Sequence, residues 1–270
     1  MDFSDITARG LVLLGCGKMG GAMLTGWLDG GLDPAAVWVI DPVPSDMVLA
    51  SGVHVNAGMP KAPAVIVIAV KPQMMGDALT QVTAAGNGET LFLSIAAGTT
   101  VSVFETAFGA DTPIVRAMPN TPAAIGQGIS ALVGNAKVDD AKLTLAEELL
   151  AAVGQTVRLD SEADMDAVTA VSGSGPAYVF HLIETLAAAG EAEGLSSDLA
   201  LRLAQATVAG AGALAEASDE SPSQLRINVT SPNGTTQAAL EVLMDETSGF
   251  PPLLMRAVKA AAGRSRELGK

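Results

Sequence analysis

Short, continuous apolar runs alternate with segments of helical length over the first part of the chain. The apolar runs predict strands at 11–14, 37–40, 65–69, 91–95, 114–118, 129–133 and 156–159. The segments between them predict helices at 19–28, 74–84, 101–108 and 139–153. Strands that are apolar throughout are buried on both faces, which is typical of a mainly parallel sheet covered by helices. We therefore predict an α/β domain with a doubly wound sheet over residues 1–162.

The pattern changes beyond residue 160, where strand-like runs nearly disappear. Alanine-rich stretches predict helices at 177–193, 197–217, 235–246 and 252–268, and so an all-α domain over residues 163–270. Residues 178–183 are apolar almost all round, as in a helix buried on every side. In a domain of only about 110 residues, burial of a helix on every side is supplied most easily across a dimer interface. We expect a homodimer that assembles into a larger homo-oligomer.

Three glycines with the spacing G-x-G-x-x-G follow the first predicted strand, at Gly15, Gly17 and Gly20. The first glycine permits a tight turn, the second lets a pyrophosphate approach the backbone, and the third lets the helix pack closely on the strand. The helix dipole and free N–H groups then face the anion. Glycines also occur in purely structural turns, but the order strand, glycines, helix, with Asp41 after the second strand, favours dinucleotide binding.

Composition narrows the range of partners. The chain has 270 residues, of which 49% are hydrophobic and 16% charged, and a formal net charge of −14. This charge argues against nucleic acid or an anionic membrane as the main partner. An anionic ligand must instead be held by backbone N–H groups or a few placed cations.

Compartment and redox state follow from the same composition. The mean hydropathy is +0.39, yet no segment has the length and apolarity of a spanning helix. The first residues lack the pattern of a signal peptide, and we expect a cytoplasmic protein. Cys16 is the single cysteine, which excludes an internal disulfide framework. Inside the glycine turn it serves as a small residue, with a redox role as the alternative.

The usual catalytic side chains are scarce. The chain has two histidines, His54 and His181, and one tyrosine, Tyr178. The motifs of metal sites and nucleophile elbows do not occur, so we predict no metal. His181 is expected to be a hydrogen-bonded core histidine. Hydride transfer from a nicotinamide to a protonated imine fits this set, because the cofactor supplies the difficult chemistry and the protein mainly orients it.

Two loops at the carboxyl ends of predicted strands are candidates for cofactor contacts. Residues 69–72, Ala-Val-Lys-Pro, bring Lys71 close to the sheet edge, although a solvated lysine explains the spacing equally well. Residues 118–122, Met-Pro-Asn-Thr-Pro, combine a rigid backbone with amide and hydroxyl groups. This second loop is either a rigid turn or a nicotinamide contact.

Two further candidates open helices in the second domain. Residues 172–176, Ser-Gly-Ser-Gly-Pro, place Ser174 where it could cap a long helix, and from the spacing this motif is either a cap or a functional site. Residues 231–236, Ser-Pro-Asn-Gly-Thr-Thr, form a helix start with small residues and free N–H groups. Such a start suits a carboxylate, with a simple N-cap as the alternative.

Taken together, these motifs resemble those of the pyrroline-5-carboxylate reductases, the last enzymes of proline biosynthesis. The resemblance runs nearly end to end through the segments GCGKMG, AVKP, SIAAGTT, RAMPNTPA, AVTAVSGSGPAYVF and VTSPNGTT. It implies an N-terminal Rossmann domain that binds NADP or NAD. It further implies an all-helical C-terminal dimerisation domain, with active sites built where subunits meet.

The resemblance also assigns roles to individual residues. Substrate carboxylate would meet the backbone of Gly234 and Thr235, and the Thr236 hydroxyl would hydrogen-bond the ring nitrogen. Glu162 and Ser174 match further substrate-side positions, and Ser174 and Thr236 are the implied catalytic residues. The implied cofactor contacts are Gly15, Gly17, Lys18, Met19, Gly20, Asp41, Asn56, Ala69, Val70, Lys71, Ala97, Asn120 and Asn228.

Two departures from the family pattern concern the sites themselves. Asn233 replaces a loop glycine, and asparagine is the residue that best tolerates left-handed φ after glycine, so the turn is expected to be preserved. Asp41 stands where many relatives carry small or hydroxyl residues. An acid there favours the ribose 2′-OH of NAD and repels the 2′-phosphate of NADP.

The resulting main hypothesis is a reductase that transfers a hydride from NAD(P)H to the C=N carbon of 1-pyrroline-5-carboxylate and yields L-proline. A second hypothesis keeps the fold and changes the substrate to another cyclic imine or a β-hydroxy acid. A third is a nucleotide-sensing dimer without catalysis.

Overall fold

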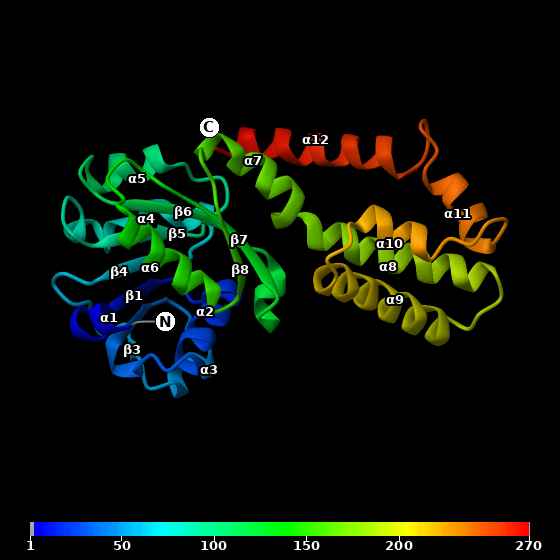
Figure 1. Ribbon diagram of the computed structural model, residues 1–270. Coiled ribbons are helices and arrows are strands. Elements are labelled where there is room, and N and C mark those ends of the chain that lie inside the picture. Colours follow the sequence, from blue (N-terminus) through cyan, green and yellow to red (C-terminus); the bar gives the residue numbers. More distant parts are fainter. Residues whose placement is uncertain (1–2, 270) are drawn as a thin grey trace. The chain divides into compact units, whose positions relative to one another are not determined.

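The computed structural model describes residues 3–269, which form two compact units. The first unit comprises the chain up to Gly173 together with the segment from Ala262 onward, and the second comprises Ser174–Ala261 (Figure 1). The C-terminal segment is tied to the first unit by the Ser265 hydroxyl, which donates a hydrogen bond to Asp166 Oδ1 at 2.5 Å. The domain boundary predicted between residues 162 and 163 stays a prediction.

One eight-stranded sheet forms the centre of the first unit, in the order β3-β2-β1-β4-β5-β6-β7-β8. All neighbouring strands are parallel except β6 and β7. The short connection over residues 119–127 explains this exception, because a parallel crossover needs a dozen or more residues. The strands are β1 Leu11–Leu14, β2 Val37–Ile40, β3 His54–Val55, β4 Val65–Ile68, β5 Leu91–Ser94, β6 Ile114–Met118, β7 Gly128–Gly134 and β8 Gly154–Arg158.

Helices cover both faces of the sheet, and side-chain alternation along the strands divides the core into two clusters. On β1, Leu11 and Leu13 pack with α2 and α6, whereas Val12 and Leu14 pack with α4 and α5. The predicted α/β class with a mainly parallel sheet is confirmed. The helices of this unit are α1 Ser4–Arg9, α2 Lys18–Asp29, α3 Asp46–Ala50, α4 Met75–Thr80, α5 Val101–Phe108, α6 Asp140–Ala151 and α7 Met165–Val168.

The differences from the predicted elements lie in short segments. The helix predicted at 74–84 ends at Thr80, and Thr83–Ala85 forms a separate 3-10 turn. Side-chain hydroxyls accompany this break, since Thr83 Oγ1 donates to the carbonyl of Leu79 and competes for backbone acceptors. The elements α1, α3 and β3 were not predicted, because pieces of two to six residues carry no periodic signal.

The second unit is helical, as predicted. The helix predicted at 235–246 ends at Leu243, just before a tight loop in which Asp245 Oδ1 accepts hydrogen bonds from Thr247 and Ser248. Nowhere in residues 3–269 is a helix both long and apolar enough to cross a membrane. The helices are α8 Gly175–Ala192, α9 Ser197–Ala217, α10 Pro222–Asn228, α11 Thr235–Leu243 and α12 Phe250–Leu268, whose last turns belong to the first unit.

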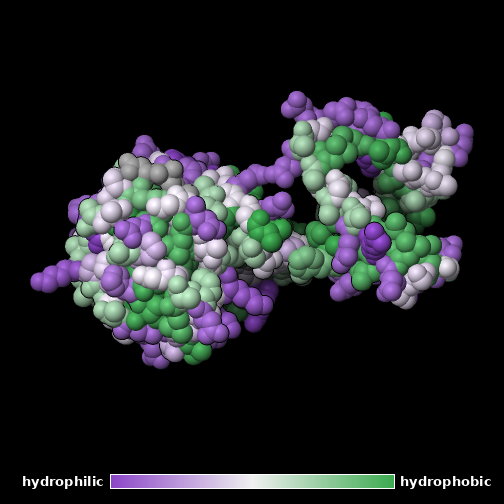
Figure 2. Space-filling view, turned by 90° about the horizontal axis from the view of Figure 1, so that it is seen from below, coloured by the Kyte–Doolittle hydropathy of each residue, from purple (hydrophilic) through white to green (hydrophobic). Residues whose placement is uncertain are grey.

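The second unit buries very little apolar surface in a single chain. Its core cluster consists of Ala187, Ala200 and Ala204, with Ile183 packed against them. Large apolar side chains are instead exposed, and Figure 2 shows apolar residues gathered on the surface of this unit. They include Val179, Phe180, Leu182, Leu199, Leu203, Leu214, Val229, Val242, Leu254 and Met255.

The burial predicted for residues 178–183 is therefore absent within one chain. Phe180 is 58% exposed, and the His181 side chain is 74% exposed, with its Nδ1 lying 3.1 Å from Glu184 Oε2. The prediction of a core histidine at 181 is wrong for the single chain, because the core cluster of this unit takes only Ala187 and Ile183 from α8. An apolar surface of this kind is normally covered by a partner.

The loop between α11 and α12 provides a prediction on pH dependence. Hydrogen bonds from Thr247 and Ser248 hold the pKa of the Asp245 carboxyl below its usual range. A native pKa below the unfolded one stabilises the fold above the unfolded pKa of about 4, and this contribution is lost as the pH falls below it. We expect Asp245→Asn to lose less stability than the wild type between about pH 6 and pH 3.

The measurement is urea unfolding of the full chain at fixed protein concentration, followed by circular dichroism. Glu246→Gln removes the same charge from the neighbouring position and is the matched control for loss of a charge as such. Parallel pH profiles for Asp245→Asn and the wild type would contradict the prediction.

Candidate nucleotide and substrate sites

The glycine turn joins the end of β1 to the start of α2, and each glycine has a distinct geometry. Gly15 has a φ of +87°, and a Cβ atom there would lie 2.8 Å from Val70 Cγ1. At Gly20 a Cβ atom would lie 2.6 Å from the carbonyl oxygen of Gly15. The tight turn and the close helix–strand packing predicted from the sequence are thus present.

Gly17 differs from the other two glycines, since no atom lies within 4 Å of the place its Cβ would occupy. A ligand can therefore approach the backbone at this point. The N–H groups of Lys18 and Met19, in the first turn of α2, have no acceptor inside the helix. Together with the positive end of the helix dipole they suit an anion, so the residues present fit the pyrophosphate of a dinucleotide.

Asp41, which follows β2, is connected to the glycine turn. Its Oδ2 accepts the N–H of Cys16 at 2.6 Å and its Oδ1 accepts the N–H of Val43 at 2.8 Å. Asn56 in turn holds the backbone of Asp41 with two hydrogen bonds, of 3.0 and 2.8 Å. The two residues therefore fix the loop after β2 against the turn, and each carboxylate oxygen keeps a further acceptor site for a ribose hydroxyl.

Cys16 lies inside this arrangement with 7% of its surface exposed. Burial, together with the charge of Asp41, raises the pKa of the Cys16 thiol to about 11. A thiol that stays protonated is a poor nucleophile and a poor metal ligand. Its burial favours the first of the two interpretations from the sequence, a small residue in the turn.

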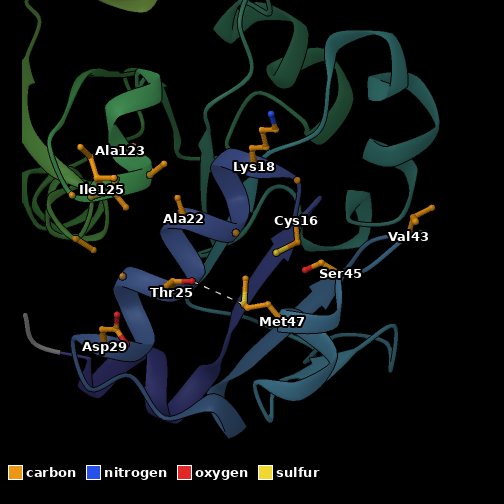
Figure 3. A pocket seen from close by; sticks show the side chains of 17 residues that line it. Cys16, Lys18, Ala22, Thr25, Asp29, Val43, Ser45, Met47, Ala123 and Ile125 are labelled. Carbon is orange, nitrogen blue, oxygen red and sulfur yellow. Dashed lines mark hydrogen bonds between the residues drawn. The ribbon is translucent and has the colours of Figure 1, made fainter. Parts of the chain in front are cut away.

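A cavity of about 780 Å³ begins at the glycine turn, at Cys16, Gly17 and Lys18. It continues along the outward side of α2, past Ala22, Thr25 and Asp29 (Figure 3). The opposite side of α2 carries Met23, Leu24 and Trp27, which are buried in the core. Beyond the glycine turn the cavity therefore follows the helix rather than the edge of the sheet.

The predicted cofactor loops of the first unit meet at one edge of the sheet. Strands β1, β4, β5 and β6 are adjacent and parallel, so their carboxyl ends lie side by side. Ala69–Lys71 follow β4, Ala97 follows β5 and Asn120 follows β6. Asn120 is partly engaged within the chain, because its Oδ1 accepts the N–H of Ile129 at 2.9 Å.

Glu162 is held at the same edge by a residue that was not predicted. Glu162 Oε1 accepts hydrogen bonds from Arg116 Nη1 at 2.7 Å and from the N–H of Val101 at 2.9 Å. The Arg116 side chain is 6% exposed and that of Glu162 33%. The signal in the sequence was a lone charge within the apolar run 114–118.

In the second unit, the segment Ser231–Gly234 forms a tight turn in front of α11. The N–H of Gly234 donates to the carbonyl of Ser231 at 3.0 Å, and Asn233 has a φ of +57°. Asparagine thus adopts the left-handed conformation expected of it, and Gln237 Oε1 accepts its N–H at 2.7 Å. Thr235 and Thr236 open the helix, where N–H groups lack intrahelical acceptors.

Two other predicted residues of the second unit lie at helix ends. Ser174 precedes α8, but its side chain makes no capping hydrogen bond. Capping therefore does not account for this serine. Asn228 ends α10, and its amide is bonded to Gln224 and Glu220 in the same segment. Within residues 3–269, no three histidine, cysteine or acidic residues are grouped as metal ligands.

Comparison with protein families divides the chain in a similar way. Residues 162–268 match the family described as pyrroline-5-carboxylate reductase dimerisation. Residues 10–98 match the family described as NADP oxidoreductase, coenzyme F420-dependent.

Individual relatives match over the whole length. The pyrroline-5-carboxylate reductase of Pseudomonas aeruginosa is 41% identical over 266 residues, which cover 96% of this chain and 97% of the relative. The solved structure of the enzyme from Coxiella burnetii aligns with a TM-score of 0.91 at 34% identity, over 97% of this chain and 99% of the other. The structure from Plasmodium falciparum, which has NADP bound, aligns with a TM-score of 0.84 at 29% identity, over 98% and 99%.

The match in sequence covers both the dinucleotide turn and the helical unit, and the solved structures align with nearly the full length of the chain. The protein belongs to the pyrroline-5-carboxylate reductase family.

Proposed function

We propose that this protein reduces 1-pyrroline-5-carboxylate to L-proline, the last step of proline biosynthesis. When bound, NAD(P)H supplies the hydride that is added to the carbon of the C=N bond, while the ring nitrogen keeps its proton. The observation that carries this assignment is the 41% identity to a pyrroline-5-carboxylate reductase over 96% of the chain.

The first unit supplies the cofactor-binding groups of this proposal. The open backbone at Gly17 and the first turn of α2 would hold the pyrophosphate. Asp41 would face the adenosine ribose from the end of β2. The sheet-edge residues Ala69–Lys71, Ala97 and Asn120 would line the path to the nicotinamide, and the resemblance adds Asn56 and Asn228.

The second unit supplies the groups that would recognise the substrate. The helix start at Gly234 and Thr235 offers N–H groups and a positive dipole end to the carboxylate. The Thr236 hydroxyl would hydrogen-bond the ring nitrogen and orient the imine. The absence of a capping bond from Ser174 leaves its hydroxyl for the substrate. These residues bind and orient, which is what hydride transfer requires of a protein.

The experiment that tests the activity measures cofactor oxidation with pyrroline-5-carboxylate, separately with NADH and NADPH. Oxidation only with another cyclic imine, or with a keto acid, would transfer the assignment to a different substrate. Nucleotide binding without oxidation of any of these substrates would identify a nucleotide sensor instead.

Thr236→Val tests the substrate side of the site. The substitution keeps the shape of the side chain and removes the hydroxyl, so kcat should fall on the order of a hundredfold, as when one hydrogen bond to the reacting atoms is lost. The dissociation constant for the nucleotide should not change. Thr207→Val, at an exposed position of α9, is the matched control. Unchanged turnover in Thr236→Val would remove this residue from the mechanism.

Asp41→Asn tests the choice of cofactor. Two like charges about 4 Å apart repel by roughly 1 kcal/mol in water and by roughly 4 kcal/mol near a protein surface. Removing the charge should therefore raise kcat/KM with NADPH relative to NADH by on the order of tenfold. The loss of one carboxylate acceptor weakens the loop and lowers both values together, so the ratio is the informative quantity. An unchanged ratio would show that Asp41 does not select the nucleotide.

We also propose that the chain forms a homodimer through the second unit and that dimers assemble further. The support is the exposed apolar surface over a core of three alanines. Light scattering should give a mass greater than two chains of 27.2 kDa each. Phe180→Glu should reduce that mass to the single chain, whereas Ile125→Glu, at a 74% exposed position of the first unit, should not. A wild-type mass of one chain would contradict both steps.

For localisation we propose the cytoplasm, in keeping with a free, protonated thiol at Cys16. Cell fractionation with an antibody against the chain tests this assignment.

A further inference from the structure

Arg116 is the only buried Lys, Arg, Asp or Glu in residues 3–269, with 5% of its surface exposed. It is the central residue of β6, between Val115 and Ala117. Alternation places it on the same face as Ile114, which packs in the core cluster with Phe104 of α5. A permanently charged guanidinium at such a position is costly unless it is paired, and none of the roles described above uses it.

Its partner Glu162 does more than neutralise the charge. The same oxygen, Oε1, also accepts the N–H of Val101, the first residue of α5. Thr100, at the N-cap of α5, makes no side-chain capping bond, because its hydroxyl is bonded to that of Ser102 at 2.9 Å. Glu162 therefore supplies from 61 positions away the anion that the N-terminus of this helix lacks.

The two segments that Glu162 joins lead into the two loops assigned to the nicotinamide. On β5, Ser94 lies directly beside Arg116 in the sheet register, and the loop that follows it carries Ala97 and ends at α5. On β6, Arg116 is followed by the segment that carries Asn120. The two hydrogen bonds to Glu162 thus link the end of the loop that carries Ala97 to the strand that leads into the loop of Asn120.

From this arrangement we propose that Arg116 is a positioning residue for hydride transfer. Through Glu162 it fixes the N-terminus of α5 against β6, and so holds the loops of Ala97 and Asn120 at a constant separation around the nicotinamide. The reaction in this proposal, hydride transfer, rests on the proposed function. The connection of α5 to β6 through Glu162 is observed in the structure. Arg116 touches neither substrate nor cofactor in this role.

The test compares Arg116→Met, Arg116→Lys and Glu162→Gln with Lys137→Met in the full-length protein. Lys137 and Asp111 form an ion pair of the same 2.7 Å length in the same unit, but their side chains are 47% and 76% exposed. Lys137→Met is therefore a matched control for loss of an ion pair as such. The readouts are kcat, the nucleotide dissociation constant, the kinetic isotope effect with NADH or NADPH deuterated at C4, and the nicotinamide emission of the binary complex without substrate.

We expect Arg116→Met to lower kcat by about 10- to 100-fold, the usual effect of a small misplacement of the reacting groups. Nucleotide affinity should stay within about threefold. The isotope effect should rise, because hydride transfer becomes more fully rate-limiting, and the emission should move towards that of free cofactor. Arg116→Lys should recover most of kcat, because an ammonium group can still bond to Glu162. Lys137→Met should match the wild type in all four readouts.

A folded Arg116→Met with wild-type kcat, isotope effect and emission would overturn the proposal, as would a loss of kcat explained entirely by weaker nucleotide binding. Where Arg116→Met fails to fold, Glu162→Gln decides through the emission of the binary complex, because Glu162 also matches a substrate-side position and a change in kcat has two explanations. The substitution keeps an oxygen for Val101 but weakens the bond to Arg116, so an emission shifted towards that of free cofactor supports the proposal and a wild-type emission overturns it. The emission measurement needs no substrate, so it separates failure of this proposal from failure of the proposed function.

Discussion

The close approach of α2 to β1 at Gly20 is the contact on which the first unit depends. Any side chain there would collide with the carbonyl of Gly15, so only glycine lets the helix begin directly on the end of the strand. Further along the helix, the indole N–H of Trp27 donates to the carbonyl of Leu149 at 2.8 Å and ties α2 to α6. With both ends fixed, the positive end of the helix dipole is held at the carboxyl edge of the sheet. Backbone packing alone therefore presents N–H groups that suit an anion, without a cluster of basic side chains.

The second unit depends on a different constraint, the lack of apolar burial within one chain. Three alanines and part of Ile183 cannot offset the conformational entropy of ordering more than eighty residues. The apolar residues needed for a larger core are present but exposed. Residues 162–268 match a dimerisation family, and under the proposed homodimer another copy would complete the missing core. Folding of this unit and assembly of the protein are then coupled, and its stability depends on protein concentration.

Long periodic segments were predictable from the sequence, and local hydrogen-bond networks were not. The strand at 11–14 and the helix at 197–217 match the structure at both ends, because continuous apolar runs and an uninterrupted helical pattern each allow one interpretation. The glycine spacing predicted the turn, and the left-handed Asn233 followed from its side-chain chemistry. In contrast, the sequence showed Arg116 only as a lone charge within the apolar run 114–118 and predicted no partner for it. Its role became visible only when the fold brought Glu162 and Val101 to it, since no spacing rule relates residues that distant in the sequence.

Asp41 and Glu162 show how a chain with a net charge of −14 can present a site for an anionic ligand. Both carboxylates lie at the carboxyl edge of the sheet, and both accept backbone N–H groups. Glu162 is in addition neutralised by Arg116, so its charge contributes little to the field at the nucleotide. Asp41 forms no ion pair within residues 3–269. Under the proposed function its charge faces the adenosine ribose, so the residue that stiffens the glycine turn would also set the electrostatic cost of a 2′-phosphate. Rigidity of the turn and choice of nucleotide would then be coupled in one side chain.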